Sequence, residues 1–408
     1  MDDKYFDVKD SLYDITEKYE EAIDLLVSVG FDHMKDENRR KTFGKSISLE
    51  DALKLKKINL DTFVSQLIER IQRNGDESHS SSKEKNAVKI LGVLPCPVKV
   101  PLTEAFENWI RNQNFDFTLE YELKAASTGV DWLEDVLKEQ SEEKLPDIFI
   151  SAGFDLFFDK NLLGKYKEKN IFEDITGLSQ YNKDFDNDTI RLKDPNNQYS
   201  MIGVVPAVFL INEQELKGRK KPTSWEELLK PEFEGSVSLP IGDFDLFHAI
   251  LLNIYKLYGE EGVKGLGKIL QSGMHPSQMV KSYIKKSNKP AVTIMPYFFT
   301  KMVTPATPMT PVWPREGAII SPIFLLSKES KKERLKPIVD FFASKQVGEI
   351  LSHNGKFPSV HPKVDNEIEK ENKYIWIGWD YIENNDIANL IKKCEEIFNN
   401  VVKGGEKR

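Results

Sequence analysis

Five short stretches of the chain combine the small, polar and aromatic residues that can face a bound ligand. Each lies where an apolar run ends or a helical pattern begins, and in an open α/β sheet this edge is where ligands bind. We therefore predict that these residues form a ligand-binding site and that backbone N–H groups at the helix starts contact the ligand. The stretches are Pro95-Cys96-Pro97, Ser127-Thr128-Gly129, Ser151-Ala152-Gly153, Gly242-Asp243 and Met295-Pro296-Tyr297.

Cys96 has the strongest potential for covalent chemistry, because a cysteine at the start of a helix can act as a nucleophile or as a ligand of a soft metal. Nucleophilic catalysis also needs a base beside the thiol, and no His or Asn lies at a spacing that marks such a partner. The sequence therefore favours a buried thiol that lines a binding site, and no catalytic residue is predicted. A Cys96-dependent enzyme on the same scaffold is the alternative.

The side chains in these stretches leave the charge of the ligand open. Asp243 and Asp245 suit a cation, although acidic residues in the first turn of a helix also stabilise the helix dipole. Tyr297 is a candidate for an aromatic contact, whereas Phe298 and Phe299 are predicted core residues. Gly, Ser and Thr at three helix starts slightly favour an oxyanion or a carboxylate held by N–H groups. A polyamine and a metal ion stay open as ligands.

Composition excludes several classes of protein. The chain has 408 residues, a formal net charge of −8, two cysteines and six histidines. The charge is spread along the chain and forms no basic stripe of the kind that nucleic acid requires. The two cysteines are far apart, which excludes a disulfide framework and disfavours a cysteine zinc site; no metal site and no cofactor are predicted. No apolar run reaches about 18 residues, so no membrane span is predicted.

Residues 1–73 have the pattern of a small helical domain. Apolar residues recur at helical spacing over residues 19–27, and Ser48 with Asp51 is typical of a helix start. Another helix is predicted from Asp61, and residues 31–44 are predicted to form a loop. A polar, Ser-rich run at residues 74–86 follows and is predicted to be a flexible linker.

From Ala87 onward, apolar runs of strand length alternate with helical patterns, which is typical of a parallel α/β sheet. Pro206 interrupts the longest run and fits an edge or a strand junction, but not the middle of a sheet. A helix over residues 387–401 ends the chain, and we expect it to complete the first of two lobes. The predicted strands cover residues 88–94, 117–125, 147–150, 200–212, 235–240, 291–296 and 311–326.

This order of elements resembles that of the solute-binding proteins of bacterial ABC importers, and in particular the group that includes ferric-ion and polyamine binders. The resemblance implies a type 2 periplasmic-binding-protein-like fold, in which two α/β lobes joined by two crossovers close on a ligand like a hinge. PTSWEELLKPEFEG before a strand is its most specific part. The stretches that carry it are DIFISAGFDLFF (147–158), SMIGVVPAVFLINEQEL (200–216), PTSWEELLKPEFEGSVSLP (222–240), VTIMPYFF (292–299), VWPREGAIISPIFLLSKES (312–330) and GKFPSVHP (355–362).

The resemblance also implies where the lobes and the hinge lie. Residues 87–205 with about 321–408 would form the first lobe, and residues 206–320 the second. The crossovers would lie near Val205-Pro206 and Ile320-Ser321.

The same resemblance bears on the ligand. Ferric binders of this group usually present adjacent paired tyrosines, but this sequence has Tyr297-Phe298-Phe299 and no Tyr-Tyr pair, which argues against direct iron(III) chelation. Polyamine binders offer several acids and a tryptophan, for which Asp243 and Trp313 are available.

The N-terminal region resembles a small bacterial helical domain of unknown function that occurs beside hemerythrin-like and iron–sulfur repair modules. LLVSVGF and TFGKSISLEDALKLKKINLD carry this resemblance. Many members have a cysteine pair after the Gly-Phe, where this chain has His33 and Met34, so metal or redox chemistry is not expected here. The prediction is a module that binds a protein partner or a second copy, and a purely structural cap is the alternative.

The predicted function is the binding of a small molecule or ion between two hinged lobes, without catalysis, by a solute-binding protein or an intracellular sensor or carrier. A regulatory scaffold that docks a redox or metal protein through residues 1–73 is a further alternative. The first ten residues are charged and lack the apolar core of a secretory signal. We therefore expect a cytoplasmic protein, or an extracytoplasmic one if a removed signal precedes this sequence.

Overall fold

The structure, a computed structural model, divides the chain into two compact units, Met1–Lys85 and Asn86–Arg408. Each unit has a hydrophobic core of its own. The residues that the structure describes are 5–19, 21–28, 31, 34, 36–55, 60, 63–64, 67–68, 87–126, 142, 145–273, 282–284 and 288–405.

The N-terminal unit is helical. At the start of α4 the hydroxyl of Ser48 accepts the N–H of Asp51 at 3.2 Å, as the capping pattern predicts. Met34 is fully buried in the core of this unit, so it is a packing residue. The described helices are α1 (Leu12–Lys18), α2 (Glu21–Ser28), α3 (Glu37–Arg39), the π-helical turn η2 (Arg40–Gly44) and α4 (Leu49–Leu55).

One prediction for this unit is wrong and another is only partly covered. Residues 31–44 are not a loop throughout, because α3 and η2 occupy the second half; a carboxylate oxygen of Asp36 accepts the N–H of Arg39 at 2.9 Å and starts that helix. The helix predicted from Asp61 lies largely outside the described residues, although Phe63 and Leu67 are buried. His33 also lies outside them.

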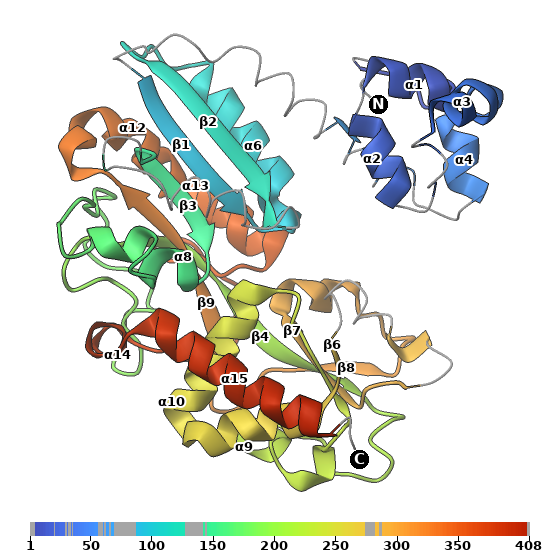
Figure 1. The fold of residues 1–408 in the computed structure, drawn as a ribbon. Helices are drawn as coiled ribbons and strands as arrows, with labels where there is room; N and C mark the ends of the chain where they lie inside the picture. Colours follow the sequence, from blue (N-terminus) through green and yellow to red (C-terminus); the bar gives the residue numbers. More distant parts are fainter. Residues whose placement is uncertain are drawn as a thin grey trace. The chain divides into compact units, whose positions relative to one another are not determined.

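The second unit is built on one mixed sheet, with ten strands in the part of the chain that the structure describes (Figure 1). The hydrogen-bonded order is β2-β1-β3-β9-β4-β7-β5-β6, while β8 pairs with β4 and β10 pairs with β9. The strands are β1 (Ala87–Leu94), β2 (Thr118–Ala125), β3 (Ile148–Ala152), β4 (Ser200–Asn212), β5 (Val237–Leu239), β6 (Leu270–Gly273), β7 (Val292–Pro296), β8 (Met309–Val312), β9 (Ala318–Ser327) and β10 (Tyr374–Ile375).

The sheet has a lobe at each end. We call the half with β2-β1-β3 the first lobe and the half with β7-β5-β6 the second lobe. Within the first lobe β1 is parallel to β2 and β3, and within the second β5 is parallel to β6 and β7, which confirms the predicted α/β class. Strands β4 and β9 run between the halves and pair with each other antiparallel. The residue numbers predicted for the lobe boundaries stay a prediction.

Helices α6 (Cys96–Ile110) and α12 (Lys332–Phe342) pack together in the first lobe, where the ring of Phe106 lies 5.3 Å from that of Phe341 and 4.8 Å from that of Phe342. Helix α6 begins at Cys96, which agrees with the prediction that this cysteine lies at the start of a helix. Pro97 is compatible with this start because an N–H in the first turn of a helix has no intrahelical partner. Helix α13 (Lys345–Glu349) and the π-helical turn η11 (Ile350–Asn354) follow α12.

Pro206 lies inside the continuous strand β4, opposite Ile320 of β9. Two residues earlier, the N–H of Val204 points away from β9 and donates to the carbonyl of Pro358 at 2.9 Å. Because residues two apart in a strand point their N–H groups to the same side, the missing N–H of Pro206 falls on that side too. Pairing with β7 begins only at Ala207, so Pro206 occupies the junction where the second edge of β4 changes partner, as its sequence context predicts.

The second lobe is covered on one face by α10 (Phe244–Ile269). Gly259 (φ 65°, ψ −157°) interrupts this helix, and glycine is the residue that adopts such a backbone at low cost. Ser224 caps α9 (Trp225–Leu228), and Trp225 is fully buried against Phe209 of β4. None of the helices in the described residues is long and apolar enough to cross a membrane.

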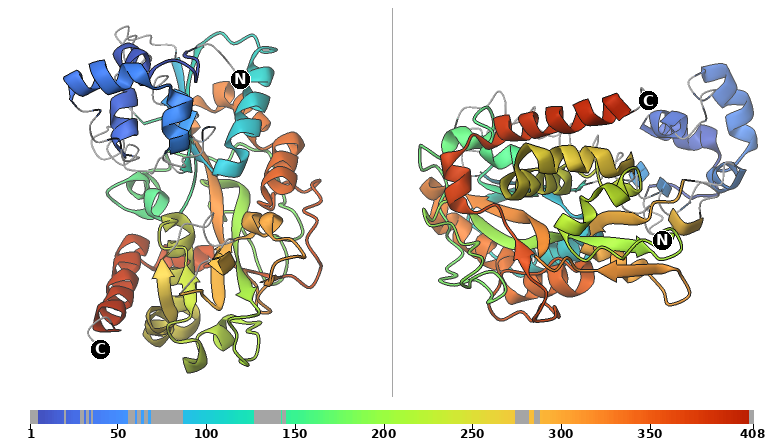
Figure 2. Two further views of the ribbon diagram at one scale, coloured as in Figure 1. Left: turned by 90° about the vertical axis from the view of Figure 1, so that its right-hand side faces the viewer. Right: turned by 90° about the horizontal axis from the view of Figure 1, so that it is seen from below.

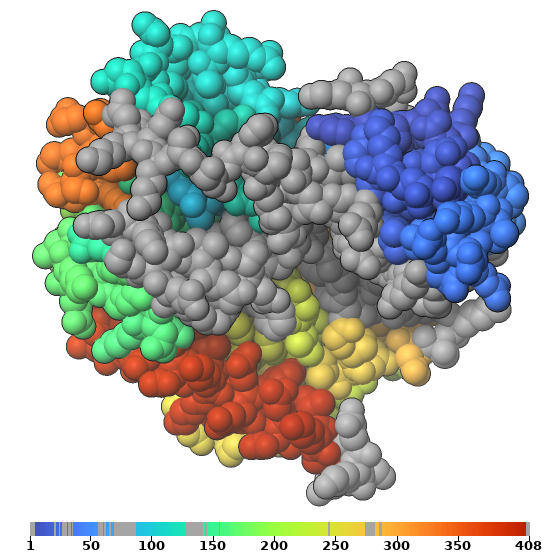
Figure 3. All heavy atoms as spheres, turned by 45° about the horizontal axis from the view of Figure 1, so that its top comes forward, coloured from blue at the N-terminus to red at the C-terminus, as the bar shows by residue number. Residues whose placement is uncertain are grey.

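The C-terminal helix α15 (Ile387–Gly405) packs along α10 in the second lobe, which corrects the prediction that it completes the first (Figures 2 and 3). An imidazole nitrogen of His248 on α10 lies 3.0 Å from a carboxylate oxygen of Glu395, and this hydrogen bond lowers the pKa of Glu395. Cys394 on the same helix is fully buried, and burial raises the pKa of its thiol to about 12. The helix is therefore fixed by packing and by a polar contact.

Close approach of the two helices requires Gly267. A Cβ at this buried position would lie 2.9 Å from the Cβ of Val401. We expect Gly267→Val to lower the free energy of unfolding by roughly 1–3 kcal/mol, because overpacking forces the helices apart. Gly404→Val is the matched control, since a Cβ at Gly404 meets nothing within 4 Å. Urea unfolding measures both, and an equal effect of the two substitutions would contradict the tight packing of α15 on α10.

Candidate ligand-binding site

The first predicted stretch lies where β1 ends and α6 begins. Pro95 is the N-cap of α6, Cys96 is exposed and Pro97 is half-buried. The prediction that Cys96 is a buried thiol is therefore wrong. Its thiol has no hydrogen-bond partner among the residues that the structure describes, so no base that would activate it is present there.

The start of α6 offers few N–H groups to a ligand. Pro97 has no N–H, and the N–H groups of Val98 and Lys99 both donate to the carbonyl of Pro95, at 3.0 and 3.1 Å. Of the first turn, the N–H of Cys96 is thus the group left to contact a ligand. Pro95-Cys96-Pro97 contains no Gly, Ser or Thr, so it is not one of the three helix starts on which the argument for an oxyanion rests. Ser127-Thr128-Gly129, which is one of them, lies outside the described residues.

The stretch Ser151-Ala152-Gly153 ends β3. Ser151 and Ala152 pair with β9 and are buried, and the hydroxyl of Ser151 donates to the carbonyl of Ala152 at 3.0 Å, so this side chain is a structural one. Gly153 has a φ of 109°, a backbone conformation that side chains with a Cβ rarely adopt. A Cβ at Gly153 would collide with the carboxylate of Asp245 on α10. The end of β3 in the first lobe therefore touches the start of α10 in the second.

Gly242 and Asp243 form the turn into α10. Gly242 is exposed, and nothing lies within 4 Å of the place where its Cβ would stand. Asp243 is the N-cap, and its carboxylate accepts the N–H of Leu246 at 3.4 Å. A carboxylate at this helix start occupies one of its N–H groups and repels an anion. This helix start is therefore a poor oxyanion site, and the slight preference for an oxyanion stays a prediction for Ser127-Thr128-Gly129, which the structure does not describe.

The stretch Met295-Pro296-Tyr297 ends β7. Met295 is fully buried with Val208 and Leu210, so the prediction that it contacts a ligand is corrected: it is a core residue. Pro296 is buried and pairs with Ala207 of β4. Tyr297, which starts the 3₁₀ helix η9 (Tyr297–Met302), is half-buried and is the member of this stretch that can contact a ligand.

Two lysines near Tyr297 connect the lobes, and sequence patterns missed both. The ammonium of Lys301 on η9 donates to the carbonyl of His353 at 2.6 Å and to that of Asn354 at 2.9 Å, both in the first lobe. Lys356 donates to the hydroxyl of Tyr297 at 3.4 Å, and its ammonium lies 4.5 Å from the centre of that ring. Desolvation, and then the charge of Lys356, lower the pKa of Lys301. Only the GKFP stretch, which contains Lys356, gave a sequence signal for this contact.

The four predicted hinge residues face one another across the two crossover strands. Val205 pairs with Ser321, and Pro206 pairs with Ile320. The hydroxyl of Ser321 is buried and has no hydrogen-bond partner in the described part of the chain. The structure thus brings together the residues on which a hinge was predicted, and their motion stays a prediction.

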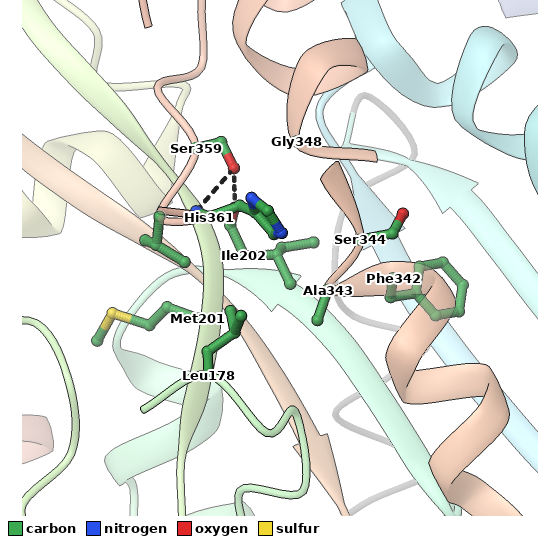
Figure 4. A pocket seen from close by; sticks show the side chains of 10 residues that line it. Leu178, Met201, Ile202, Phe342, Ala343, Ser344, Gly348, Ser359 and His361 are labelled. Atoms are coloured by element: carbon green, nitrogen blue, oxygen red, sulfur yellow. Dashed lines mark hydrogen bonds between the residues drawn. The ribbon is translucent and has the colours of Figure 1, made fainter. Parts of the chain in front are cut away.

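A small cavity in the first lobe does not belong to these walls (Figure 4). It lies between the end of α12, residues 201–202 of β4 and the segment around Ser359 and His361, and it has no room for a water molecule. The hydroxyl of Ser359 donates to the carbonyl of Ile202 at 3.3 Å and accepts the N–H of His361 at 3.1 Å. This cavity is therefore a packing gap beside a structural hydrogen-bond network.

No group of three or more His, Cys, Asp or Glu side chains in the described residues could hold a metal ion. Of the predicted walls, the end of β3 contacts the start of α10, and the end of β1 lies beside β3 in the sheet. Tyr297 follows the end of β7 in the second lobe. These walls offer an exposed thiol, a glycine at the contact between lobes, two aspartates and an aromatic ring. Such a set can grip a small solute, and it lacks the paired nucleophile and base of covalent catalysis.

Comparisons with known proteins agree with this architecture. The sequence pattern of a domain of unknown function matches residues 6–64, and no curated protein matches the chain. Among solved structures, the periplasmic binding protein P5PA is 16% identical, with a TM-score of 0.55 over 77% of this chain and 100% of that one. A ferric binding protein from Campylobacter jejuni is 15% identical (TM-score 0.54; 77% and 99% covered). The Trichodesmium protein IdiA (FutA), in complex with iron and citrate ligands, is 12% identical (TM-score 0.53; 77% and 99% covered).

These structural likenesses show the fold, and a match of sequence shows the family. The pattern of bacterial extracellular solute-binding proteins matches residues 143–385, which is more than half of the chain. It includes β4, β9 and the walls at Gly153, Gly242 and Tyr297. The chain therefore belongs to the family of bacterial extracellular solute-binding proteins.

Proposed function

We propose that this solute-binding protein holds a small molecule or ion between its two lobes and releases it by hinge opening, without making or breaking bonds in it. The observation that carries the proposal is that the lobes meet on both sides of the predicted walls. On one side Gly153 abuts Asp245, and on the other Lys301 binds the carbonyls of His353 and Asn354. These contacts support the proposal that the lobes close on each other.

A ligand can stabilise this closed state only through contacts that the open state lacks. The exposed ammonium of Lys301 contributes about 1 kcal/mol through its two hydrogen bonds, because exposed charged groups gain little over their contacts with water. This energy changes the ratio of closed to open molecules by a factor of about five. Any larger shift of that equilibrium must come from the binding of the ligand.

The ligand we infer is not a bare ferric ion held by tyrosines. Of the three solved structures named above, one is a ferric binding protein and one is in complex with iron and citrate, but their identities to this chain are only 15% and 12%. In this chain Tyr297 is followed by two phenylalanines, and Lys356 places a positive charge over its ring, which disfavours a second cation at the phenol oxygen. An organic solute gripped by side chains and few backbone N–H groups agrees better with the walls.

Residues 1–73 are proposed to bind a protein partner, and the whole chain to act in the cytoplasm as a sensor or carrier. The support for a separate role is that this unit has its own core, independent of the solute-binding unit. Fractionation of the native bacterium with an antibody against the chain tests the location, and recovery in the periplasmic fraction would sink that part of the proposal.

Gly153→Val tests whether contact between the lobes closes the molecule. We expect the variant to open, with a larger radius of gyration in small-angle X-ray scattering, because its side chain and the carboxylate of Asp245 cannot occupy the same space. It also loses roughly 1–2 kcal/mol through its positive φ.

Gly218→Val is the control for the strain alone. Gly218 has a φ of 85°, but a Cβ there meets nothing within 4 Å. We expect the control to lower Tm without changing the radius of gyration. If both variants keep the wild-type radius, the Gly153 contact does not govern closure.

Lys301→Met tests the second contact. We expect the ratio of closed to open molecules without ligand to fall about fivefold, because the two hydrogen bonds to the first lobe are lost. Single-molecule energy transfer between dyes on the two lobes measures this ratio. Lys160→Met is the control, since Lys160 is exposed and has no partner among the described residues. Equal distributions for both variants would reject a closing role for Lys301.

A thermal-shift screen of the full chain over amines, carboxylates, oxyanions and metal ions identifies the ligand, because a ligand of the folded state raises Tm. The compound that binds between the lobes must stabilise Gly218→Val and lose its effect on Gly153→Val. A compound that raises the Tm of both variants equally binds elsewhere and would count against the proposed site.

A further inference from the structure

The second lobe contains a pocket of about 380 Å³ on the face of the sheet opposite to α10. Val208 of β4 lines it and packs with Leu210 and Met295 on that face. The alternate residue, Phe209, points to the other face, where it packs on Trp225 beside α10. The pocket therefore lies on the face of β4 opposite to α10, and Tyr297 is a residue that it shares with the proposed solute site.

A wide interruption in strand pairing creates this pocket. Phe209 of β4 pairs with Val312 of β8, and Ala207 pairs with Ile319 of β9, so residues 313–318 stand opposite Val208 alone. This loop carries Trp313 out of the sheet and beside the pocket. Beside Val208, the wall of the pocket is therefore formed by the side chain of Trp313 and not by a paired strand.

Two aromatic rings form one wall. The rings of Trp313 and Tyr297 meet edge to face at 5.2 Å, and the indole N–H of Trp313 donates to the carbonyl of Lys373 at 2.6 Å. Trp313 also contacts Tyr374 edge to face at 5.3 Å. The indole is therefore held in place while it stays half-exposed towards the pocket.

A second part of the lining is acidic. Glu367, Glu369 and Asn372 line the pocket from the segment that leads into β10. Both carboxylates are exposed, and neither forms an ion pair or a side-chain hydrogen bond within the part of the chain that the structure describes. The ammonium of Lys301 interacts electrostatically with Glu367, but its hydrogen bonds go to the carbonyls of His353 and Asn354. Two carboxylates and two aromatic rings thus line the same pocket.

We propose that this pocket is a second site, which binds an organic ammonium cation. Aromatic faces attract cations through their quadrupole. The ammonium of Lys356 already lies 4.5 Å from the centre of the Tyr297 ring, so the indole of Trp313 is the aromatic group left for a further cation. The carboxylates at the rim supply the opposite charge, Asn372 supplies a hydrogen-bond acceptor, and Val208 with Val312 covers alkyl groups. An anion would be repelled by the two glutamates. The site is distinct from the one proposed between the lobes, although Tyr297 belongs to the walls of both.

Choline and its neutral isostere 3,3-dimethylbutan-1-ol test the charge, because they have the same shape. We expect isothermal titration of the full chain to show choline binding at least tenfold more tightly than the alcohol, and more weakly as salt increases. Equal binding of the two probes, or binding of glucose in preference to choline, overturns the proposal.

The double variant Glu367→Gln/Glu369→Gln locates the site. Both side chains are exposed and keep their size, so we expect the variant to fold with unchanged Tm and to bind choline about tenfold more weakly. Glu371→Gln is the matched control, an exposed glutamate of the same segment that does not line the pocket, and it retains wild-type affinity. Choline binding that survives the double variant, or that falls equally in the control, rejects this pocket as the site.

Discussion

Both lobes depend on the antiparallel pairing of β4 with β9. Each strand carries pairing partners of the first lobe at one end and of the second lobe at the other: β9 pairs with β3, and β4 with β7 and β8. Pro206 lies where the second edge of β4 changes partner, so the ladder is held by β9 alone at that point. A strand with one bonded edge bends more easily than one with two, and the sheet is thus weakest to bending where the lobes join.

That constraint explains the form of the contacts between the lobes. A hinge of two strands fixes the direction of motion but supplies little energy for either state, so closure depends on small contacts at a distance from it. Gly153 provides one by allowing the backbone to approach Asp245, and Lys301 provides another by donating to two carbonyls. Neither is strong, which keeps the closed state sensitive to a ligand. The walls between these contacts offer fewer N–H groups than their Gly, Ser and Thr content suggests, since Pro97 and Asp243 occupy the helix starts.

The fold was accessible from sequence because apolar runs and caps are local. The run Ser200–Asn212 forms one strand as predicted, and Ser224 caps α9 within the PTSWEELL stretch.

Contacts between helices and strands are harder to predict from sequence. An amphipathic helix shows that one face is buried but not against which lobe, and this is why α15 was assigned to the wrong one. The prediction that Met295 contacts a ligand is wrong because a residue at the end of a strand can face either the core or the ligand. The sequence does not show which of these two directions its side chain takes. Lys301 has no periodic signal at all, since a polar residue in an exposed turn forms its contact only through tertiary structure.

Tyr297 shows how the two sites of this molecule relate. Its hydroxyl accepts a hydrogen bond from Lys356 of the first lobe, while its ring lines the pocket beside Trp313 in the second. Lys301, four residues later on the same 3₁₀ helix, carries the other contact to the first lobe. A movement of η9 on opening would therefore shift one wall of the pocket, while the wall of Glu367 and Glu369 lies on the segment that leads into β10 and is tied to β9. The aromatic wall would move with η9, whereas the acidic wall would move with β10 and β9. A cation that contacts both walls therefore favours the conformation in which the two walls lie close together. By linkage, occupancy of either site then changes the affinity of the other.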